Sequence, residues 1–285
     1  MATFNLLVSF LMEKIEYYTF YEEIKMEKKV AIVTGGTRGM GQSISLRLAK
    51  EGNIVIAVYR SHKESAEKTR KLLKEISPES DIHQCDITVE SDATAMVDLI
   101  AKRYGRLDIL VNNAGIFDFN FLEDMDGDYL QRVIDGNFKS QYYMMRAAVK
   151  HMKKHAYGRV ANASSISGNF SDVGLIAYAA SKASVNMMTK IGSAELAPYN
   201  ITVNAYAPGI IHTDMTDAMI QERGEIQVKQ ISLNRFGNGD DVAALVSFLV
   251  SEEAGYVTGE IIGVDGGFFK VQNAYRAYEY AKERN

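Results

Sequence analysis

Cysteine is scarce in this chain: Cys85 is the only one among 285 residues, and tryptophan is absent. A single cysteine excludes an intrachain disulfide and any cysteine-rich metal site, so the sequence fits a reducing compartment and we expect a cytoplasmic protein. No apolar run approaches the roughly 20 residues that a membrane span needs. A basic segment before the first apolar residues is also lacking, so no secretory signal is expected.

The chain also lacks a strong excess of either charge, because its 32 Lys or Arg and 36 Asp or Glu leave a formal net charge of only -4. This balance lacks the basic footprint of a nucleic-acid-binding protein, so no nucleic-acid partner is expected. The length and the 47% of hydrophobic residues suit one large globular domain with an ample core. His151 and His155 have the spacing of helical metal ligands, but lysines fill the gap between them, and no metal site is predicted.

Short apolar runs alternate with amphipathic stretches from Met26 onward. The expected strands are 30–34, 54–58, 82–85, 108–112, 160–163, 201–205 and 261–264. Helices are expected at 42–51, 64–76 and 93–104, and in two long stretches on either side of the fifth strand. This alternation predicts one α/β domain over 26–268, with a parallel sheet covered by helices on both faces. Residues 1–25 are interpreted as an N-terminal extension, either an extra helix or an upstream start, and 269–285 as a C-terminal tail.

A glycine-rich turn follows the first expected strand and reads Thr34-Gly35-Gly36-Thr37-Arg38-Gly39-Met40-Gly41. Where such a turn opens a helix, backbone N–H groups approach a pyrophosphate at the positive helix end. The spacing is T-G-x-x-x-G-x-G rather than G-x-G-x-x-G, and the alternative is a turn that needs glycine dihedrals for its own sake. The strand before it and the helix after it favour a dinucleotide site.

The residues after the second strand bear on which dinucleotide binds. An acid there would accept hydrogen bonds from both ribose hydroxyls, but this chain has Tyr59, Arg60 and Ser61. Arg60 and Arg38 can together clamp a 2′-phosphate, since guanidinium matches phosphate geometry; two solvated arginines are the alternative. The sequence therefore predicts NADP(H) in preference to NAD(H).

Two further strand ends complete the predicted cofactor site. Asp86-Ile87 follows the third strand, where Asp86 either bonds the adenine amine or caps a turn. Asn112-Asn113-Ala114-Gly115 ends the fourth strand, and its small residues leave room for a ligand at the switch point of the sheet. Alone, that tetrapeptide is also compatible with an ordinary turn.

Three side chains in the stretch from 164 to 182 suggest a proton-transfer device. Tyr178 and Lys182 are four residues apart, so a helix places them on one face, and Ser165 lies upstream. A free tyrosine has a pKa near ~10, and a neighbouring positive charge lowers it, so the phenol can exchange a proton with a carbonyl oxygen near neutral pH. The alternative is an apolar ring beside a solvated lysine.

Together, these motifs and Asn204-Ala205-Tyr206-Ala207-Pro208-Gly209 resemble the short-chain dehydrogenase/reductase family over about 28–268. The resemblance implies a single Rossmann-type doubly wound domain with a seven-stranded parallel sheet. It also implies a Ser-Tyr-Lys triad joined by Asn137, whose backbone holds a water that links to the lysine. The alternative for Asn137 is a polar residue packed inside a kinked helix.

The resemblance also implies the division of labour. Hydride passes from the nicotinamide to a carbonyl carbon while Tyr178 protonates the oxygen, Ser165 orients it, and Lys182 lowers the tyrosine pKa and bonds the nicotinamide ribose. The resemblance implies further cofactor contacts. Ile211 and Thr213, which follow Pro208-Gly209, would contact the nicotinamide carboxamide. The adenosine side would be lined by Asn113, Gly115 and the backbone of Ile87. A homo-dimer or homo-tetramer built on the two long helices and the last strand is expected.

Within the family, segments 234–237, 256–260 and 264–267 resemble the 3-oxoacyl-(acyl-carrier-protein) reductases, although many sugar and alcohol dehydrogenases share them. That group often has a basic residue just before the sixth strand to meet an acidic carrier. Here Pro198-Tyr199-Asn200 stands there, with Lys153 and Lys154 as substitutes. The expected substrate wall is apolar and suits an acyl chain or another hydrophobic ketone; it comprises Asn169, Phe170, Leu175, Ile176, Phe117 and 214–221.

The open alternatives are a dehydrogenase for a sugar, steroid or other hydrophobic alcohol, and a dinucleotide-binding sensor without turnover. The complete set of Ser165, Tyr178, Lys182 and Asn137 favours an enzyme.

Overall fold

The computed structural model describes residues 28–282, so the interpretation of residues 1–25 lies outside the described part of the chain. Its centre is one parallel sheet of seven strands in the order β3-β2-β1-β4-β5-β6-β7. The chain reverses its direction of travel across the sheet between β1 and β4, as in a Rossmann-type fold. The strands are β1 (Val30–Thr34), β2 (Ile54–Tyr59), β3 (Asp81–Gln84), β4 (Ile109–Asn112), β5 (Gly158–Ala163), β6 (Ile201–Pro208) and β7 (Ile261–Val264).

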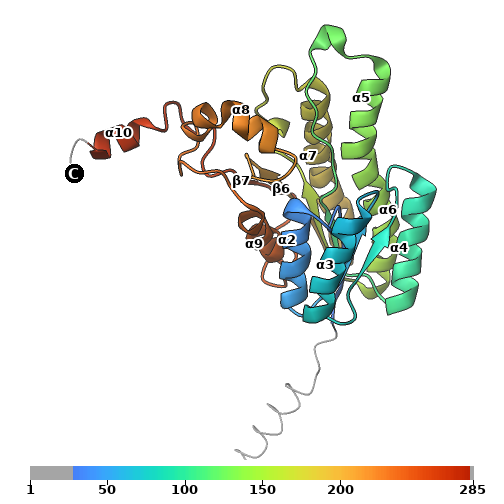
Figure 1. Ribbon diagram of the computed structural model, residues 1–285. Coiled ribbons are helices and arrows are strands. Elements are labelled where there is room, and N and C mark those ends of the chain that lie inside the picture. Colours follow the sequence, from blue (N-terminus) through green and yellow to red (C-terminus); the bar gives the residue numbers. More distant parts are fainter. Residues whose placement is uncertain (1–27, 283–285) are drawn as a thin grey trace, which may run out of the picture.

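Helices cover both faces of this sheet (Figure 1). One face packs against α2 (Gly39–Lys50), α3 (Lys63–Ile76) and α9 (Gly239–Leu249), the other against α4 (Glu90–Tyr104), α6 (Ser140–Met152) and α7 (Ile176–Leu196). Successive side chains of a strand point to opposite faces, so β1 contributes to two separate cores. Val30 and Ile32 belong to the core under α4 and α6, whereas Ala31 and Val33 belong to the core under α2 and α9. The predicted doubly wound α/β domain is confirmed.

Element bounds differ from the sequence expectation mainly around the ligand-facing edge. Helix α2 begins at Gly39 rather than at residue 42, so its first turn is part of the glycine-rich turn. The sixth strand continues to Pro208 rather than ending at residue 205, because it pairs with β5 as far as Tyr206 and with β7 as far as Pro208. The first long helical stretch is divided into α5 (Gly127–Ile134), a π-helical turn (Asp135–Lys139) and α6.

The remaining helices are α8 (Asp217–Val228) and the short α10 (Arg276–Lys282), which lies in the tail and points away from the body of the domain (Figure 1). Tyr278 in this helix donates a hydrogen bond to the carbonyl oxygen of Ser232 at 2.9 Å. The segment interpreted as a C-terminal tail thus contains a short helix. Among residues 28–282, no helix is long and apolar enough to cross a membrane.

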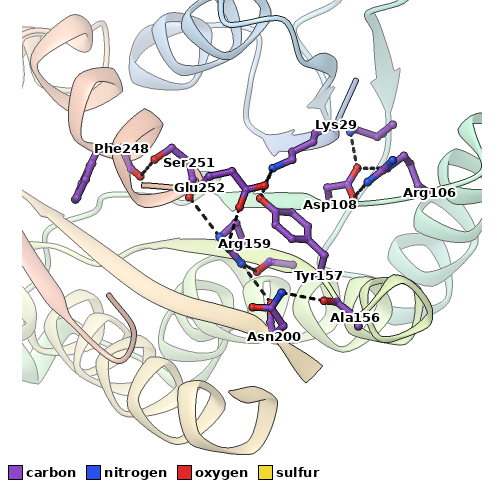
Figure 2. A network of polar contacts seen from close by, with 12 residues as sticks. Lys29, Arg106, Asp108, Ala156, Tyr157, Arg159, Asn200, Phe248, Ser251 and Glu252 are labelled. Atoms are coloured by element: carbon purple, nitrogen blue, oxygen red, sulfur yellow. Dashed lines mark hydrogen bonds and ion pairs between the residues drawn. The ribbon is translucent and has the colours of Figure 1, made fainter. Parts of the chain in front are cut away.

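A polar network ties the amino-terminal ends of the strands together, at the edge of the sheet remote from the glycine-rich turn (Figure 2). The fully buried Asp108 accepts hydrogen bonds from the backbone N–H of Val30 at 2.8 Å and from Arg106 Nε and Nη2 at 2.8 and 2.9 Å. Arg159, which is 2% exposed, donates to the carbonyl oxygens of Gly158 and Asn200. Every buried charge in this network therefore has a partner, which its burial requires.

Asp108→Ala should destabilise the domain by about 3 kcal/mol, because it leaves the Val30 N–H and the Arg106 guanidinium without their buried acceptor. Urea unfolding followed by circular dichroism measures this change. Glu79→Ala is the matched control, since it removes an exposed ion pair with Lys28 and should cost less than about 1 kcal/mol. Equal effects of the two variants would contradict the prediction.

Candidate active site

A cavity of about 260 Å³ lies at the carboxyl ends of β1 to β4. Twelve residues that the sequence predicts for cofactor binding line it: Gly35, Thr37, Arg38, Gly39, Met40, Gly41, Arg60, Asp86, Ile87, Asn113, Gly115 and Thr213. The structure adds others that sequence reasoning missed, among them Val58, His62, Cys85, Thr88, Ile116 and Gly136, and it also brings Met215 of the expected substrate wall to the cavity. Most of these follow or end a strand, so the carboxyl end of each strand was the available signal.

Close backbone approach explains the glycines of the turn. A Cβ on Gly41 would lie 2.1 Å from the carbonyl oxygen of Gly35, a distance that only glycine allows. Gly39 has a φ of 51°, in the left-handed region that glycine adopts without strain. The amide Nδ2 of Asn113 donates to the carbonyl oxygens of Thr34 at 3.1 Å and Gly35 at 3.3 Å, so the turn is fastened to the end of β4.

Five predicted cofactor contacts do not line this cavity, namely Tyr178, Lys182, Pro208, Gly209 and Ile211. Pro208 is the buried last residue of β6, and the N–H of Gly209 donates to the carbonyl oxygen of Val264 at 3.0 Å. Ile211 is buried and forms a bridge with Gly237. In the structure Pro208, Gly209 and Ile211 hold the end of β6 against β7 and the 232–237 segment, and the cofactor contacts of all five residues stay predictions.

The arginines expected at a 2′-phosphate are both exposed and both line the cavity. Nη1 of Arg60 lies 4.0 Å from Oδ2 of Asp86. Oδ1 of Asp86 accepts hydrogen bonds from the backbone and the hydroxyl of Thr88, at 3.0 and 2.7 Å. Burial acts to raise the pKa of Asp86, but the Thr88 hydrogen bonds and the Arg60 charge hold that pKa below its ordinary value. Asp86 is thus a charged turn residue that Arg60 already faces.

The predicted catalytic side chains meet at one end of α7. The buried Ser165 follows β5, and its hydroxyl acts to lower the pKa of the Tyr178 phenol. The ammonium of Lys182, whose side chain is buried, donates to the carbonyl oxygen of Ala163 at 2.8 Å and lies 5.6 Å from the ring centroid of Tyr178. Phe117 contacts the same ring edge-on, with centroids 5.1 Å apart. The sequence spacing therefore identified a real cluster.

Asn137 lies in the π-helical turn and is fully buried. Its Oδ1 accepts from the backbone N–H of Ile116 at 2.8 Å, and its Nδ2 donates to the carbonyl oxygen of Ile116 at 3.0 Å and to Ser181 Oγ at 3.1 Å. The packed polar residue of a distorted helix, which the sequence offered as an alternative, describes this side chain. It fastens the loop after β4 to α7 at the residue before Lys182; its link to a backbone-bound water stays a prediction.

The pKa of Tyr178 in the structure is raised, not lowered below its ordinary value as expected, and the effect of Lys182 on it stays a prediction. Burial raises the pKa of Tyr178, and the Ser165 hydroxyl only partly offsets this. The lysine is directed at a backbone carbonyl rather than at the phenol oxygen. Burial also lowers the pKa of Lys182 itself, from 10.5 to about 8. Spacing by four residues places two side chains on one face but does not say where the ammonium points.

Lys153 and Lys154, which the sequence offers in place of a basic residue just before the sixth strand, lie beside that segment: the ammonium of Lys153 is 4.0 Å from the ring centroid of Tyr199. They form a turn, Lys153–His155, that lies between the end of α6 and the first residue of β5, Gly158. Ser165 follows the other end of the same strand. These lysines therefore lie at the edge of the sheet opposite to the cavity. Their contact with a carrier stays a prediction.

A family model described as "Enoyl-(Acyl carrier protein) reductase" matches residues 35–269. The chain belongs to the short-chain dehydrogenase/reductase family. A 3-oxoacyl-(acyl-carrier-protein) reductase FabG of Staphylococcus aureus strain Mu50 is 41% identical over 246 residues, which are 86% of this chain and 100% of the relative. The FabG of Thermotoga maritima is 38% identical over 86% of this chain and 99% of its own.

A solved structure from Sinorhizobium meliloti 1021, assigned to the short-chain alcohol dehydrogenases, supports the same family. It has a TM-score of 0.81 and 31% sequence identity, and it covers 85% of this chain and 96% of its own. As a member of the short-chain dehydrogenase/reductase family, the protein is an oxidoreductase, and the family implies a nicotinamide dinucleotide as its cofactor.

The buried ammonium should make stability depend on pH in a defined direction. Below pH 8 Lys182 is charged in both states, and its burial weakens folding in full. Between pH 8 and 10.5 the folded protein loses this proton while the unfolded chain keeps it, so the penalty is progressively relieved as the pH rises. The free energy of unfolding of the wild type, relative to Lys182→Met, should therefore rise by about 2 kcal/mol between roughly pH 7.5 and 10.

Urea unfolding of both proteins across this range measures the difference. Groups that titrate alike in the two proteins cancel in it. A difference that stays constant with pH, or that falls, would contradict the prediction.

Proposed function

We propose that the protein reduces a ketone with NADPH, and that the substrate is a 3-oxoacyl thioester. The observation that carries the proposal is the cluster of Ser165, Tyr178 and Lys182, whose ammonium lies next to Gly115 in the wall of a cavity that Arg38 and Arg60 also line. The relatives named FabG support the substrate class.

The cavity fits a phosphorylated dinucleotide. A helix that begins at Gly39 directs its free N–H groups toward the cavity, and the missing Cβ of Gly41 keeps the turn compact enough for a pyrophosphate to approach. Arg38 and Arg60 supply fork-shaped donors for a 2′-phosphate, and Asp86 holds Arg60 at the cavity before the phosphate arrives. When bound, the cofactor supplies the hydride.

Tyr178 supplies the proton. Its raised pKa keeps the phenol protonated at neutral pH, which is the form that reduction requires. As hydride adds to the carbonyl carbon, the C=O π bond breaks and the phenol proton passes to the oxygen, giving a hydroxyl group. Ser165 donates to that oxygen and stabilises its negative charge as it develops. Charged Lys182 then stabilises the phenolate that remains.

Tyr178→Phe should lower kcat for NADPH-dependent ketone reduction by about 10²- to 10⁴-fold, because the acid is lost. NADPH affinity, measured by fluorescence titration, should stay within about twofold. Tyr199→Phe is the control, since it removes an exposed phenol at the far end of α7. Undiminished activity of Tyr178→Phe would overturn the assignment. A wild type that binds NADPH but oxidises it with none of a broad ketone panel would favour a sensor.

Arg60→Ala should raise the Kd for NADPH about tenfold or more and leave the Kd for NADH nearly unchanged, because only NADPH carries the phosphate that the guanidinium bonds. Arg38→Ala should act in the same direction. Arg276→Ala, in the tail, is the control. Equal losses for both cofactors, or wild-type turnover with NADH that matches NADPH, would refute the preference.

We further propose a homo-dimer or homo-tetramer that uses α5, α6, α7 and β7. Two exposed apolar side chains on α7, Met187 and Ile191, are 55% and 52% exposed, and one edge of β7 has no partner strand among the described residues. A second protomer would cover both features.

A second candidate function is the reduction of a free hydrophobic ketone that is not carried by a protein. The observation that favours it is the excess of exposed carboxylates in residues 117–128, 169–176 and 212–228.

A further inference from the structure

The entrance beside Tyr178 is built by two loops that pack on each other. The N–H of Asn120 donates to the carbonyl oxygen of Gly174 at 3.0 Å. The Phe119 ring packs so closely on Gly174 that a Cβ at this position would lie 2.3 Å from the ring atom Cζ. Phe117, from the first loop, contacts Tyr178 directly. The two loops therefore form one wall, and residues on it lie close to the proton donor.

Apolar side chains remain exposed on this wall. Phe119 is 48% exposed, Phe170 65% and Val173 69%. Large side chains of this kind suit an apolar substrate that covers them on binding. These apolar side chains act only on a substrate that is already in contact with them, so they do not affect its approach.

The same entrance is strongly acidic. Residues 117–128, 169–176 and 212–228 contain ten Asp or Glu and one Lys or Arg, whereas the whole chain has a formal net charge of -4. Nine of the ten carboxylates are exposed. Only two of the ten have an ion-pair partner within the described chain, Asp118 with Arg132 and Asp217 with His212. The loop before α5 and helix α8 lie at the same upper end of the molecule (Figure 1).

Like charge at an entrance slows the approach of an anion and lowers its local concentration, and the effect is large where many exposed charges act together. Carrier proteins with acidic surfaces would meet this rim of exposed carboxylates, while Lys153 and Lys154 lie at the opposite ends of the strands, away from it. Among the cations near the rim, Arg132 is paired with Asp118, and Arg38 and Arg60 line the cofactor cavity.

We propose that this acidic rim selects against substrates on negatively charged carriers, so that the protein reduces an apolar ketone that arrives free and is uncharged or cationic. The carboxylates do not bind the substrate; they repel anionic carriers through their electrostatic field, and the aromatic wall contacts the substrate. The inference rests on the proposed reductase function and restricts its substrate.

The test uses one 3-oxobutyryl group on three thiols: N-acetylcysteamine, which is uncharged, coenzyme A, which carries phosphates, and acyl-carrier protein. At saturating NADPH and low salt, kcat/KM for the uncharged thioester should exceed that for the carrier protein by about tenfold or more. Raising the ionic strength to roughly 0.5 M should increase kcat/KM for the two anionic substrates several-fold and leave the uncharged one unchanged, since salt screens the field.

A charge-reversed variant isolates the rim. Glu123→Lys, Glu222→Lys and Glu225→Lys together should raise kcat/KM for the carrier-bound substrate about tenfold without changing that for the uncharged thioester. The matched control has three reversals at exposed sites away from the entrance: Glu75→Lys, Glu195→Lys and Glu253→Lys. Both variants are checked for unchanged oligomeric mass by light scattering.

Equal or better use of the carrier-bound substrate at low salt would overturn the inference, as would an equal gain in the rim variant and the control. If none of the three thioesters is reduced, the proposed 3-oxoacyl substrate fails. The inference is then decided with an uncharged cyclic ketone and its sulfonate derivative, compared in the same salt series and variants.

Discussion

A buried ammonium organises the candidate site. Lys182 is held by the carbonyl oxygen of Ala163, which also accepts from Nε2 of Gln141 at 3.1 Å. Burying a cation is costly unless it is paired, and the hydrogen-bond partner of this ammonium is a neutral backbone oxygen, so the pKa of Lys182 falls to about 8. The elements around it are arranged to keep it there: β5 supplies the acceptor, α7 supplies the lysine, and Asn137 fastens the next loop to the residue before it.

Much of the fold was predictable because the five inner strands, β2, β1, β4, β5 and β6, are buried along almost their whole length. Near-continuous apolar runs such as Val30–Thr34 can be recognised without knowing their neighbours, and all seven expected strands exist. The bounds that were missed, at Gly39 and at Pro208, depend on contacts across the sheet and on the turn, which a local pattern does not contain. The strand order likewise comes from pairing between segments far apart in the chain.

The candidate site was predictable in its membership but not in its electrostatics. Motif spacing placed Tyr178 and Lys182 on one face, and they do lie together. It could not show that the ammonium turns toward Ala163, nor that burial outweighs the effect of the Ser165 hydroxyl and raises the pKa of the phenol.

These electrostatics bear on the protonation of the site. A phenol whose pKa is raised holds its proton at neutral pH, and a lysine with a pKa near 8 is still mostly charged there. Burial disfavours the phenolate form of Tyr178. The same low-dielectric surroundings that raise the cost of a phenolate would also strengthen its attraction to the ammonium of Lys182, so the protonation states of the two groups are coupled.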